Sequence, residues 1–231
     1  MIQLDVLYED NHLLVVNKPA GLATMGALPG EDTLAEVAKR YLKRKYDKPG
    51  NVYVGVVSRL DNPVSGAIVL ARTSKAASRL SEQFREHQVE KRYWALSSSK
   101  DAAAGLPDAG QLLNWLRKDE SRRCMCVCGP RAAGAVRAEL TYRVLLRLPQ
   151  RLWLELNLIT GRKHQIRVQL SDAGCPIDGD SRYGSRVAFP HGIALHSRWL
   201  QFEHPVRHEL LTFTAPLPES WPALPPQLAR C

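Results

Sequence analysis

Short runs of apolar residues, separated by polar turns, constrain the fold of this 231-residue chain more than any other feature. Runs rich in Val, Leu and Ile that are too short for helices are typical of buried strands. Other stretches alternate apolar and polar residues, as half-buried antiparallel strands do. The strands expected on these grounds lie at 13–16, 52–57, 67–71, 93–96, 140–144, 152–158 and 210–213, with a hairpin turn at 149–151.

Three segments carry a helical pattern. Thr33 and Glu36 fit a capping box ahead of a helix with apolar residues on one face. A second helix is expected at 75–88, and a third begins after Gly161 and ends at Gly174. Strands dominate and the helices are interspersed irregularly, so the sequence predicts an α+β fold with a mixed, mainly antiparallel central sheet and flanking helices.

The whole chain is expected to form one domain. Its core is predicted at about 4–217, and a Pro-rich tail follows at about 216–231. His204 and His208 lie near the last strand and are expected at the surface, because Pro205 argues against a helix that would align them.

The chain is strongly basic, with a formal net charge of +9. Such an excess favours a polyanionic partner such as nucleic acid. One concentration of charge lies on the outer face of the first expected helix, where it indicates a solvated surface or, alternatively, an RNA contact. Its members are Lys39, Arg40, Lys43, Arg44 and Lys45.

Composition excludes several classes of protein. No apolar run reaches the roughly 18 residues of a membrane span, and the first residues lack the pattern of a signal peptide, so a cytoplasmic location is expected. The odd number of cysteines argues against a disulfide framework. Cys124, Cys126 and Cys128 alternate, which predicts one face of a strand rather than the paired spacing of a zinc site.

The segment 57–66 places Asp61 in a turn between two apolar runs. Arg59 stands two residues before it, and Pro63 and Gly66 shape the chain behind it. Many Asp residues beside Pro and Gly simply cap a turn. A carboxylate on a rigid turn between strands can also point a nucleophile or a base into a cleft, and this segment alone leaves both interpretations open.

Two further segments carry candidate functional side chains. Tyr93 lies in Lys91–Leu96, at the start of an expected strand, and an ordinary strand aromatic is the alternative. If the third helix starts near Arg162, Lys163 and Arg167 share one of its faces at i and i+4, with His164 close by. A basic helix face in water is the alternative there.

Together these segments resemble the RluA-type RNA pseudouridine synthases. Asp61 in SRLDNPVSG, Tyr93 in KRYWAL and Arg167 in TGRKHQIRVQ occur in that family's order and approximate spacing. Three more segments look like family motifs, at 8–21, 176–184 and 194–197, so the resemblance covers roughly residues 4–217. It implies a pseudouridine synthase-like catalytic domain that isomerises specific uridines in structured RNA by base flipping.

The resemblance also implies roles for the residues. Asp61 is implied as the nucleophile, and Arg167 as the arginine that keeps it ionised and oriented. Tyr93 is implied as the ring that stacks on the extruded uracil, with a hydroxyl available for proton removal. Arg59 is implied to fill the space that the flipped base leaves, and Leu195 to pack near the uracil.

Other expectations concern partners and cofactors. Arg162, Lys163, His164 and Arg198 are candidates for RNA contact. An isomerisation consumes no electrons, water or donor group, so no cofactor and no metal are expected. Ribosomal or transfer RNA is the expected partner, and the expected biological process is rRNA or tRNA processing. No membrane association and no obligate protein partner are expected, and the chain is expected to be a monomer.

The sequence departs from the family pattern in two respects, of which the first leaves the catalytic residue types intact and the second leaves the substrate open. Ser58 stands where the family usually has His before Arg-Leu-Asp, and a separate amino-terminal RNA-binding domain is not seen. The main alternative function is a non-catalytic RNA-binding or RNA-folding module on the same scaffold. A glycoside-cleaving enzyme is a third possibility, in which Asp178 or Asp180 would supply a second carboxylate.

Overall fold

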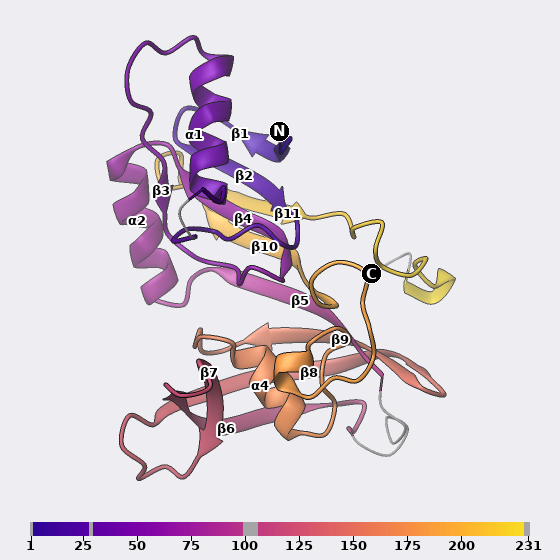
Figure 1. Ribbon diagram of the computed structural model, residues 1–231. Coiled ribbons are helices and arrows are strands. Elements are labelled where there is room, and N and C mark those ends of the chain that lie inside the picture. Colours follow the sequence, from indigo (N-terminus) through magenta and orange to yellow (C-terminus); the bar gives the residue numbers. More distant parts are fainter. Residues whose placement is uncertain (1, 28–29, 99–105, 229–231) are drawn as a thin grey trace. The chain divides into compact units, whose positions relative to one another are not determined.

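The computed structural model describes residues 2–27, 30–98 and 106–228. It divides into two compact units (Figure 1). The first unit comprises Met1–Lys91 and Ser197–Pro218, and the second comprises Arg92–His196 and Glu219–Cys231. The single domain expected from the sequence stays a prediction.

The first unit is a sheet with two flanking helices. Strands β1, β2, β4 and β10 are neighbours in that order, β11 pairs with β10, and β3 pairs with β4. The register of β2 on β4 is antiparallel, and every residue of β4 is buried. The elements are β1 (Asp5–Glu9), β2 (Leu13–Lys18), α1 (Leu34–Lys45), β3 (Gly55–Val56), β4 (Ser65–Ala71), α2 (Ser74–Arg85), β10 (Leu195–Glu203) and β11 (Leu210–Thr214).

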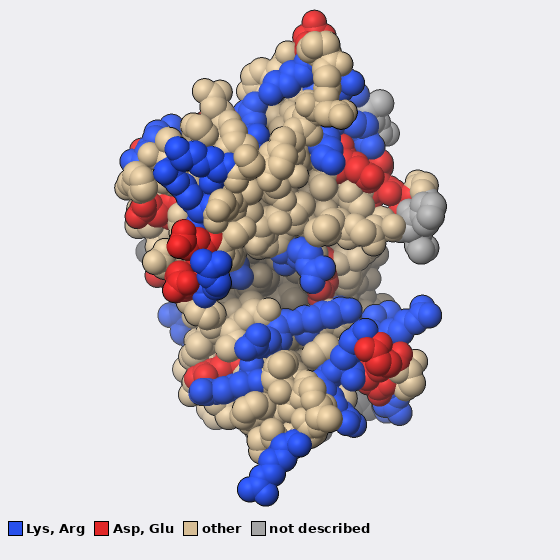
Figure 2. All heavy atoms as spheres, turned by 90° about the vertical axis from the view of Figure 1, so that its left-hand side faces the viewer, with Lys and Arg blue, Asp and Glu red and all other residues tan. Residues whose placement is uncertain are grey.

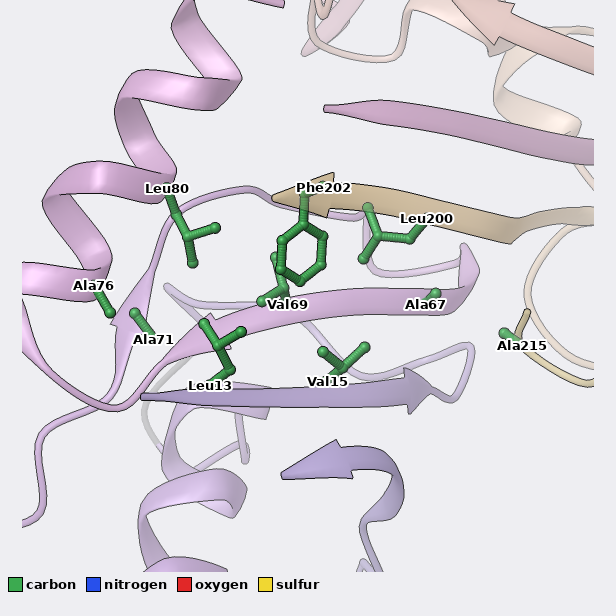
Figure 3. Packing of buried hydrophobic residues seen from close by; sticks show 10 residues of the cluster. All are labelled: Leu13, Val15, Ala67, Val69, Ala71, Ala76, Leu80, Leu200, Phe202 and Ala215. Atoms are coloured by element: carbon green, nitrogen blue, oxygen red, sulfur yellow. The ribbon is translucent and has the colours of Figure 1, made fainter. Parts of the chain in front are cut away.

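Alternate residues of β2 and β4 build the core of the first unit. Leu13 lies opposite Ala71 and Val15 opposite Val69, so these side chains share one face of the sheet. Leu80 of α2 packs against that face (Figure 3). The rest of the buried cluster is Ala67, Ala76, Leu200, Phe202 and Ala215. Apolar side chains that alternate along the strands and apolar side chains on one face of α2 therefore pack together in one core.

Strand β4 approaches β10 closely at its first residues. Gly66 has a φ of +116°, and a Cβ built there would lie 2.5 Å from the Ser197 backbone nitrogen and closer still to its carbonyl oxygen. Ser197 Oγ donates a hydrogen bond of 3.0 Å to the Ala67 carbonyl. Only glycine can adopt this backbone conformation at this distance from the neighbouring strand.

The second unit is an antiparallel sheet covered by one helix. Its strands are neighbours in the order β5, β9, β8, β6, β7. Helix α4 packs against β7 through a cluster of Val168 with Leu116, Met125, Ala138 and Tyr183. The elements are β5 (Glu90–Ser97), β6 (Ala109–Asp119), β7 (Cys124–Cys128), β8 (Val136–Leu148), β9 (Arg151–Leu158), α4 (Gln165–Asp172), η1 (Ser181–Tyr183) and η2 (Pro226–Leu228).

These elements confirm the predicted α+β class and the mainly antiparallel pairing. The capping box of Thr33 and Glu36 is present, and the three cysteines lie on β7. The expected strand at 52–57 is much shorter, since only Gly55–Val56 pairs with β4. In the Pro-rich tail, Trp221 is buried and packs against Trp153, so the tail is more than an extended segment up to residue 228; its last three residues lie outside the described part.

The third helix starts later than the sequence suggested. His164 has a left-handed backbone conformation (φ 54°), and the helix begins only at Gln165. Lys163 therefore lies outside the helix and does not share a helical face with Arg167. Arg167 itself is 5% exposed, which contradicts the alternative of a basic face in water.

The expectation for His204 was wrong as well. Its side chain is fully buried, and Nε2 lies 2.8 Å from an Asp10 carboxylate oxygen. Nδ1 accepts hydrogen bonds from the amides of Val206 and Arg207, so Nε2 carries the proton and donates to Asp10. His208 is exposed, as expected.

The close approach at Gly66 leads to a stability prediction. Gly66→Ala should destabilise the protein by about 2 kcal/mol or more, because the new methyl group meets backbone atoms and the φ is unfavourable for alanine. Gly129→Ala is the matched control, since a Cβ there meets nothing within 4 Å. Chemical denaturation of both variants measures the difference; equal stability of the two would show that β4 and β10 are not this close.

Candidate active site

The Asp61 turn connects β3 to β4 and is fixed at both of its ends. Before it, Thr24 Oγ1 donates to the Leu60 carbonyl at 2.8 Å and accepts from the Leu60 amide at 3.2 Å. Within it, the Val64 amide donates to the Asp61 carbonyl at 3.1 Å. Behind Asp61, the Gly21 amide donates to the Asn62 carbonyl at 2.9 Å. The turn is therefore a rigid support for the half-buried Asp61 side chain.

A buried lysine lies under this turn. Lys18, the last residue of β2, is fully buried, and its Nζ donates to the carbonyl oxygens of Pro19 at 2.9 Å, Leu22 at 2.7 Å and Asn62 at 3.3 Å. Burial lowers the pKa of Lys18 to about 7, while the nearby Asp61 carboxylate acts to raise that pKa. No role for Lys18 was predicted from the sequence, where the signal of a buried cation is a lysine that ends an otherwise apolar strand.

Two more predicted site residues belong to the first unit. Arg59 precedes the Asp61 turn, and its side chain is exposed. Arg198 lies on β10 and is half-buried, and its Nη1 donates to the Ala215 carbonyl. Burial lowers the pKa of Arg198. The Arg59 side chain thus extends into solvent, whereas the Arg198 side chain is partly occupied by its hydrogen bond to the Ala215 carbonyl.

Arg167 forms a buried, bidentate ion pair in the second unit. Its Nε and Nη2 donate to the two carboxylate oxygens of Asp180 at 2.7 and 2.8 Å. The side chains are only 6% and 2% exposed. The guanidinium carbon also lies 4.9 Å from the centre of the Tyr183 ring. Two parallel hydrogen bonds and a ring contact leave the Arg167 fork one orientation, which a lysine could not reproduce.

His164 is tied to the same tyrosine. Its Nδ1 lies 2.7 Å from the Tyr183 hydroxyl, and that hydroxyl accepts a 3.0 Å hydrogen bond from the Met125 amide. Burial raises the pKa of Tyr183. Tyr183 therefore joins the start of α4 to β7, and it is a supporting residue that sequence analysis did not single out.

The remaining predicted residues also lie in the second unit. Tyr93 is 5% exposed and lies on β5 opposite Leu156. Leu195 is 3% exposed at the start of β10, whose first two residues belong to the second unit. Arg162 and Lys163 are exposed in the loop before α4, and Arg162 Nε donates to the Arg137 carbonyl at 3.0 Å. The predicted set is thus divided, with Asp61, Arg59 and Arg198 in the first unit and the other six in the second.

Asp178 and Asp180 are both engaged inside the second unit. Asp178 is 1% exposed and accepts hydrogen bonds from the Ser98 amide at 2.7 Å and the Ser98 hydroxyl at 2.8 Å. Burial raises the pKa of Asp178. Asp180 is held by Arg167. Neither carboxylate resembles the solvent-reaching partner that the glycoside-cleaving alternative needs.

No group of three or more His, Cys, Asp or Glu side chains in the described part of the chain is arranged to hold a metal ion. No helix within the same residues is long and apolar enough to cross a membrane.

The low pKa of Lys18 predicts a pH-dependent stability. Between about pH 7 and the unfolded value near 10.4, the unfolded chain keeps a proton that folded Lys18 has released, so stability rises with pH. Lys18→Met lacks this group. The wild-type chain should therefore gain stability over the variant as pH rises from 7 to 9, with a slope approaching 1.4 kcal/mol per pH unit. Denaturation across this pH range measures the slope, and parallel pH profiles would contradict it.

Comparison with known proteins agrees with these observations. The model of the RNA pseudouridylate synthase family matches residues 12–172. The uncharacterized RNA pseudouridine synthase YhcT of Bacillus subtilis is 35% identical over 219 residues, which cover 94% of this chain and 69% of the relative. Ribosomal large subunit pseudouridine synthase D of Zymomonas mobilis is 33% identical over 229 residues, which cover 94% of this chain and 70% of that relative.

A solved structure agrees as well. Human RNA pseudouridylate synthase domain containing 4 matches with a TM-score of 0.76 and 29% identity, over 93% of this chain and 89% of that one. The family model covers well over half of the sequence, and two relatives exceed 30% identity over most of their length. This chain therefore belongs to the RNA pseudouridylate synthase family, a family of isomerases.

Proposed function

We propose that this chain converts uridine to pseudouridine in ribosomal RNA of the large subunit, with Asp61, Tyr93 and Arg167 as its catalytic residues. The main observation in support is the rigid Asp61 turn, to which buried Lys18 donates a hydrogen bond at the Asn62 carbonyl. The substrate is suggested by the Zymomonas relative, whose name refers to the large ribosomal subunit. Transfer RNA, the other expected substrate, is the alternative target.

The reaction is an isomerisation that needs no co-reactant. The bond between uracil N1 and ribose C1′ breaks, and a new bond forms between C1′ and uracil C5. C5 loses a proton and N1 gains one, so the composition of the RNA is unchanged. Asp61 supplies the ionised carboxylate that attacks the nucleoside or assists departure of the base. A turn fixed by hydrogen bonds on both sides keeps this carboxylate in a reactive orientation.

Arg167 is proposed to keep the reacting carboxylate ionised and oriented. A guanidinium serves this role best when its own position is fixed before the substrate arrives. Asp180 provides this fixation through two hydrogen bonds, and Tyr183 supports the guanidinium from its face. Asp180 and Tyr183 are thus positioning residues for Arg167.

The uracil has to leave its stack before it can react. Tyr93 is proposed to stack on the extruded base, a contact of about 1–3 kcal/mol, and Leu195 to pack against it. Exposed Arg59 has the reach to enter the RNA stack in place of the base. Arg162, Lys163, His164 and Arg198 stay proposed RNA contacts, although the structure engages His164 and Arg198 with other parts of the protein.

A non-catalytic RNA-binding role has no observation in its favour. Binding alone would not require a carboxylate on a rigid turn, because a carboxylate repels phosphate. The presence of Asp61 together with Tyr93 and Arg167 therefore favours an active isomerase.

The catalytic assignment can be tested with one substitution. Asp61→Asn should abolish pseudouridine formation while RNA affinity stays within a few fold, since it removes the charge with almost no change in volume. Single-turnover conversion is measured on RNA extracted from cells that lack this gene, and affinity is measured separately.

Asp47→Asn is the matched control, because Asp47 is exposed in the same unit. It should leave both the rate and the affinity unchanged. Substantial turnover by Asp61→Asn would remove Asp61 from the catalytic residues. Sequencing the modified positions in the wild-type reaction distinguishes large-subunit ribosomal RNA from transfer RNA as the target.

A further inference from the structure

A basic groove lies in the first unit between α1 and the loop that follows it. Its volume is about 650 Å³, and it is lined by Lys39, Arg40 and Lys43 of α1 and by residues 50–54. None of these lining residues belongs to the Asp61 turn, and none of them is acidic. The groove is therefore a separate feature from the candidate active site.

The cations of the groove are available for a ligand. The opposite face of α1 is buried through Leu34, Val37, Ala38 and Leu42, which turns Lys39, Arg40 and Lys43 towards solvent. Arg40 pairs with Asp32 at 2.6 Å, but both side chains are exposed and such pairs contribute little. Lys39 and Lys43 form no ion pair within the described part of the chain.

The nearest carboxylate on α1 is already engaged. Glu36 Oε2 accepts hydrogen bonds from both the amide and the hydroxyl of Thr33, as the capping box requires. Lys and Arg side chains also cover much more of the face shown in Figure 2 than Asp and Glu do. The groove thus keeps its positive charge, and an anionic ligand would meet little competition for it.

An exposed aromatic ring stands beside these cations. Tyr53 is 48% exposed, although its ring rests against Gly55 of β3. A Cβ built at Gly55 would lie 2.9 Å from the Tyr53 hydroxyl oxygen and 2.9 Å from Ala77 Cβ, so glycine makes room for the ring. Gly55 therefore supports one part of the Tyr53 ring while another part faces solvent, as base stacking on an aromatic ring requires.

We propose that this groove binds a single-stranded segment of the RNA substrate, outside the uridine that reacts. Lys39 and Lys43 contact phosphates, and the Tyr53 ring stacks on a base. This inference rests on the action of the chain on RNA. Cations alone would also suit an acidic peptide, but the combination of unpaired lysines with a supported, exposed ring favours a strand that carries both phosphates and bases.

Binding of a labelled oligouridylate at several salt concentrations tests the groove. Lys39→Gln combined with Lys43→Gln should reduce the slope of log affinity against log salt by about 1.4, because each lost contact to a single strand removes about 0.7. Tyr53→Leu should weaken binding roughly 5- to 150-fold with the slope unchanged, and Tyr53→Phe should bind like the wild type.

Lys75→Gln is the matched control. Lys75 is exposed on α2 in the same unit and lies outside the groove, so its loss should leave the salt slope unchanged. The single-turnover rate at saturating RNA should be unchanged in all of these variants, since none of them touches the reacting uridine. Thermal melting of each variant confirms that the first unit is folded.

The outcomes separate this inference from the proposed function. If the wild-type chain isomerises RNA but the double lysine variant and Tyr53→Leu bind the oligouridylate like the wild type, the groove does not bind RNA, and an acidic protein becomes the candidate occupant. Equal losses for Lys75→Gln and the lysines of the groove would also overturn it, because they would show only a general effect of charge. A wild-type chain that converts no RNA refutes the proposed function, whatever the groove binds.

Discussion

The first unit depends on the buried ammonium group of Lys18. Placing a charge inside a protein is unfavourable unless hydrogen bonds compensate for the lost water. Three carbonyl oxygens, from the end of β2, from the segment behind it and from the Asp61 turn, provide that compensation. One side chain therefore joins segments more than 40 residues apart. The low pKa of Lys18 is the consequence of its burial, which the nearby Asp61 carboxylate only partly offsets. On the other side of the turn, Gly66 allows β4 to approach Ser197 of β10.

The second unit uses a comparable principle with a different residue. Arg167 is as buried as a core side chain, and Asp180 neutralises it with two hydrogen bonds. Breaking such a pair would leave an uncompensated charge inside the protein, so the two residues act as one element. Tyr183 connects this element to β7 through the Met125 amide. Asp61 and Arg167, two of the three residues proposed for catalysis, are thus each supported by buried polar groups in their own unit.

Local patterns in the sequence predicted much of the fold. The capping box at Thr33, the alternation in 140–158 and the buried run at 67–71 depend on neighbouring residues, and the structure has each of them. The late start of α4 depends on the left-handed conformation of His164, which a non-glycine residue rarely adopts. The burial of His204 against Asp10 and the pairing of Arg167 with Asp180 depend on where loops return, and no periodic pattern records this. Six motifs in order identified the candidate site and included Lys18, Asp180 and Tyr183, but the supporting roles of these three residues emerged only from the structure.

The most direct test of the account is an experimental structure of the Asp61→Asn protein bound to a uridine-containing RNA that the wild-type chain modifies. We expect one uridine to be turned out of its stack, with its base on the Tyr93 ring and its ribose beside residue 61. The Arg59 side chain should occupy the space that the extruded base leaves in the RNA stack. A target uridine that stays stacked in the RNA, or an extruded base that lies away from both Tyr93 and residue 61, would contradict it.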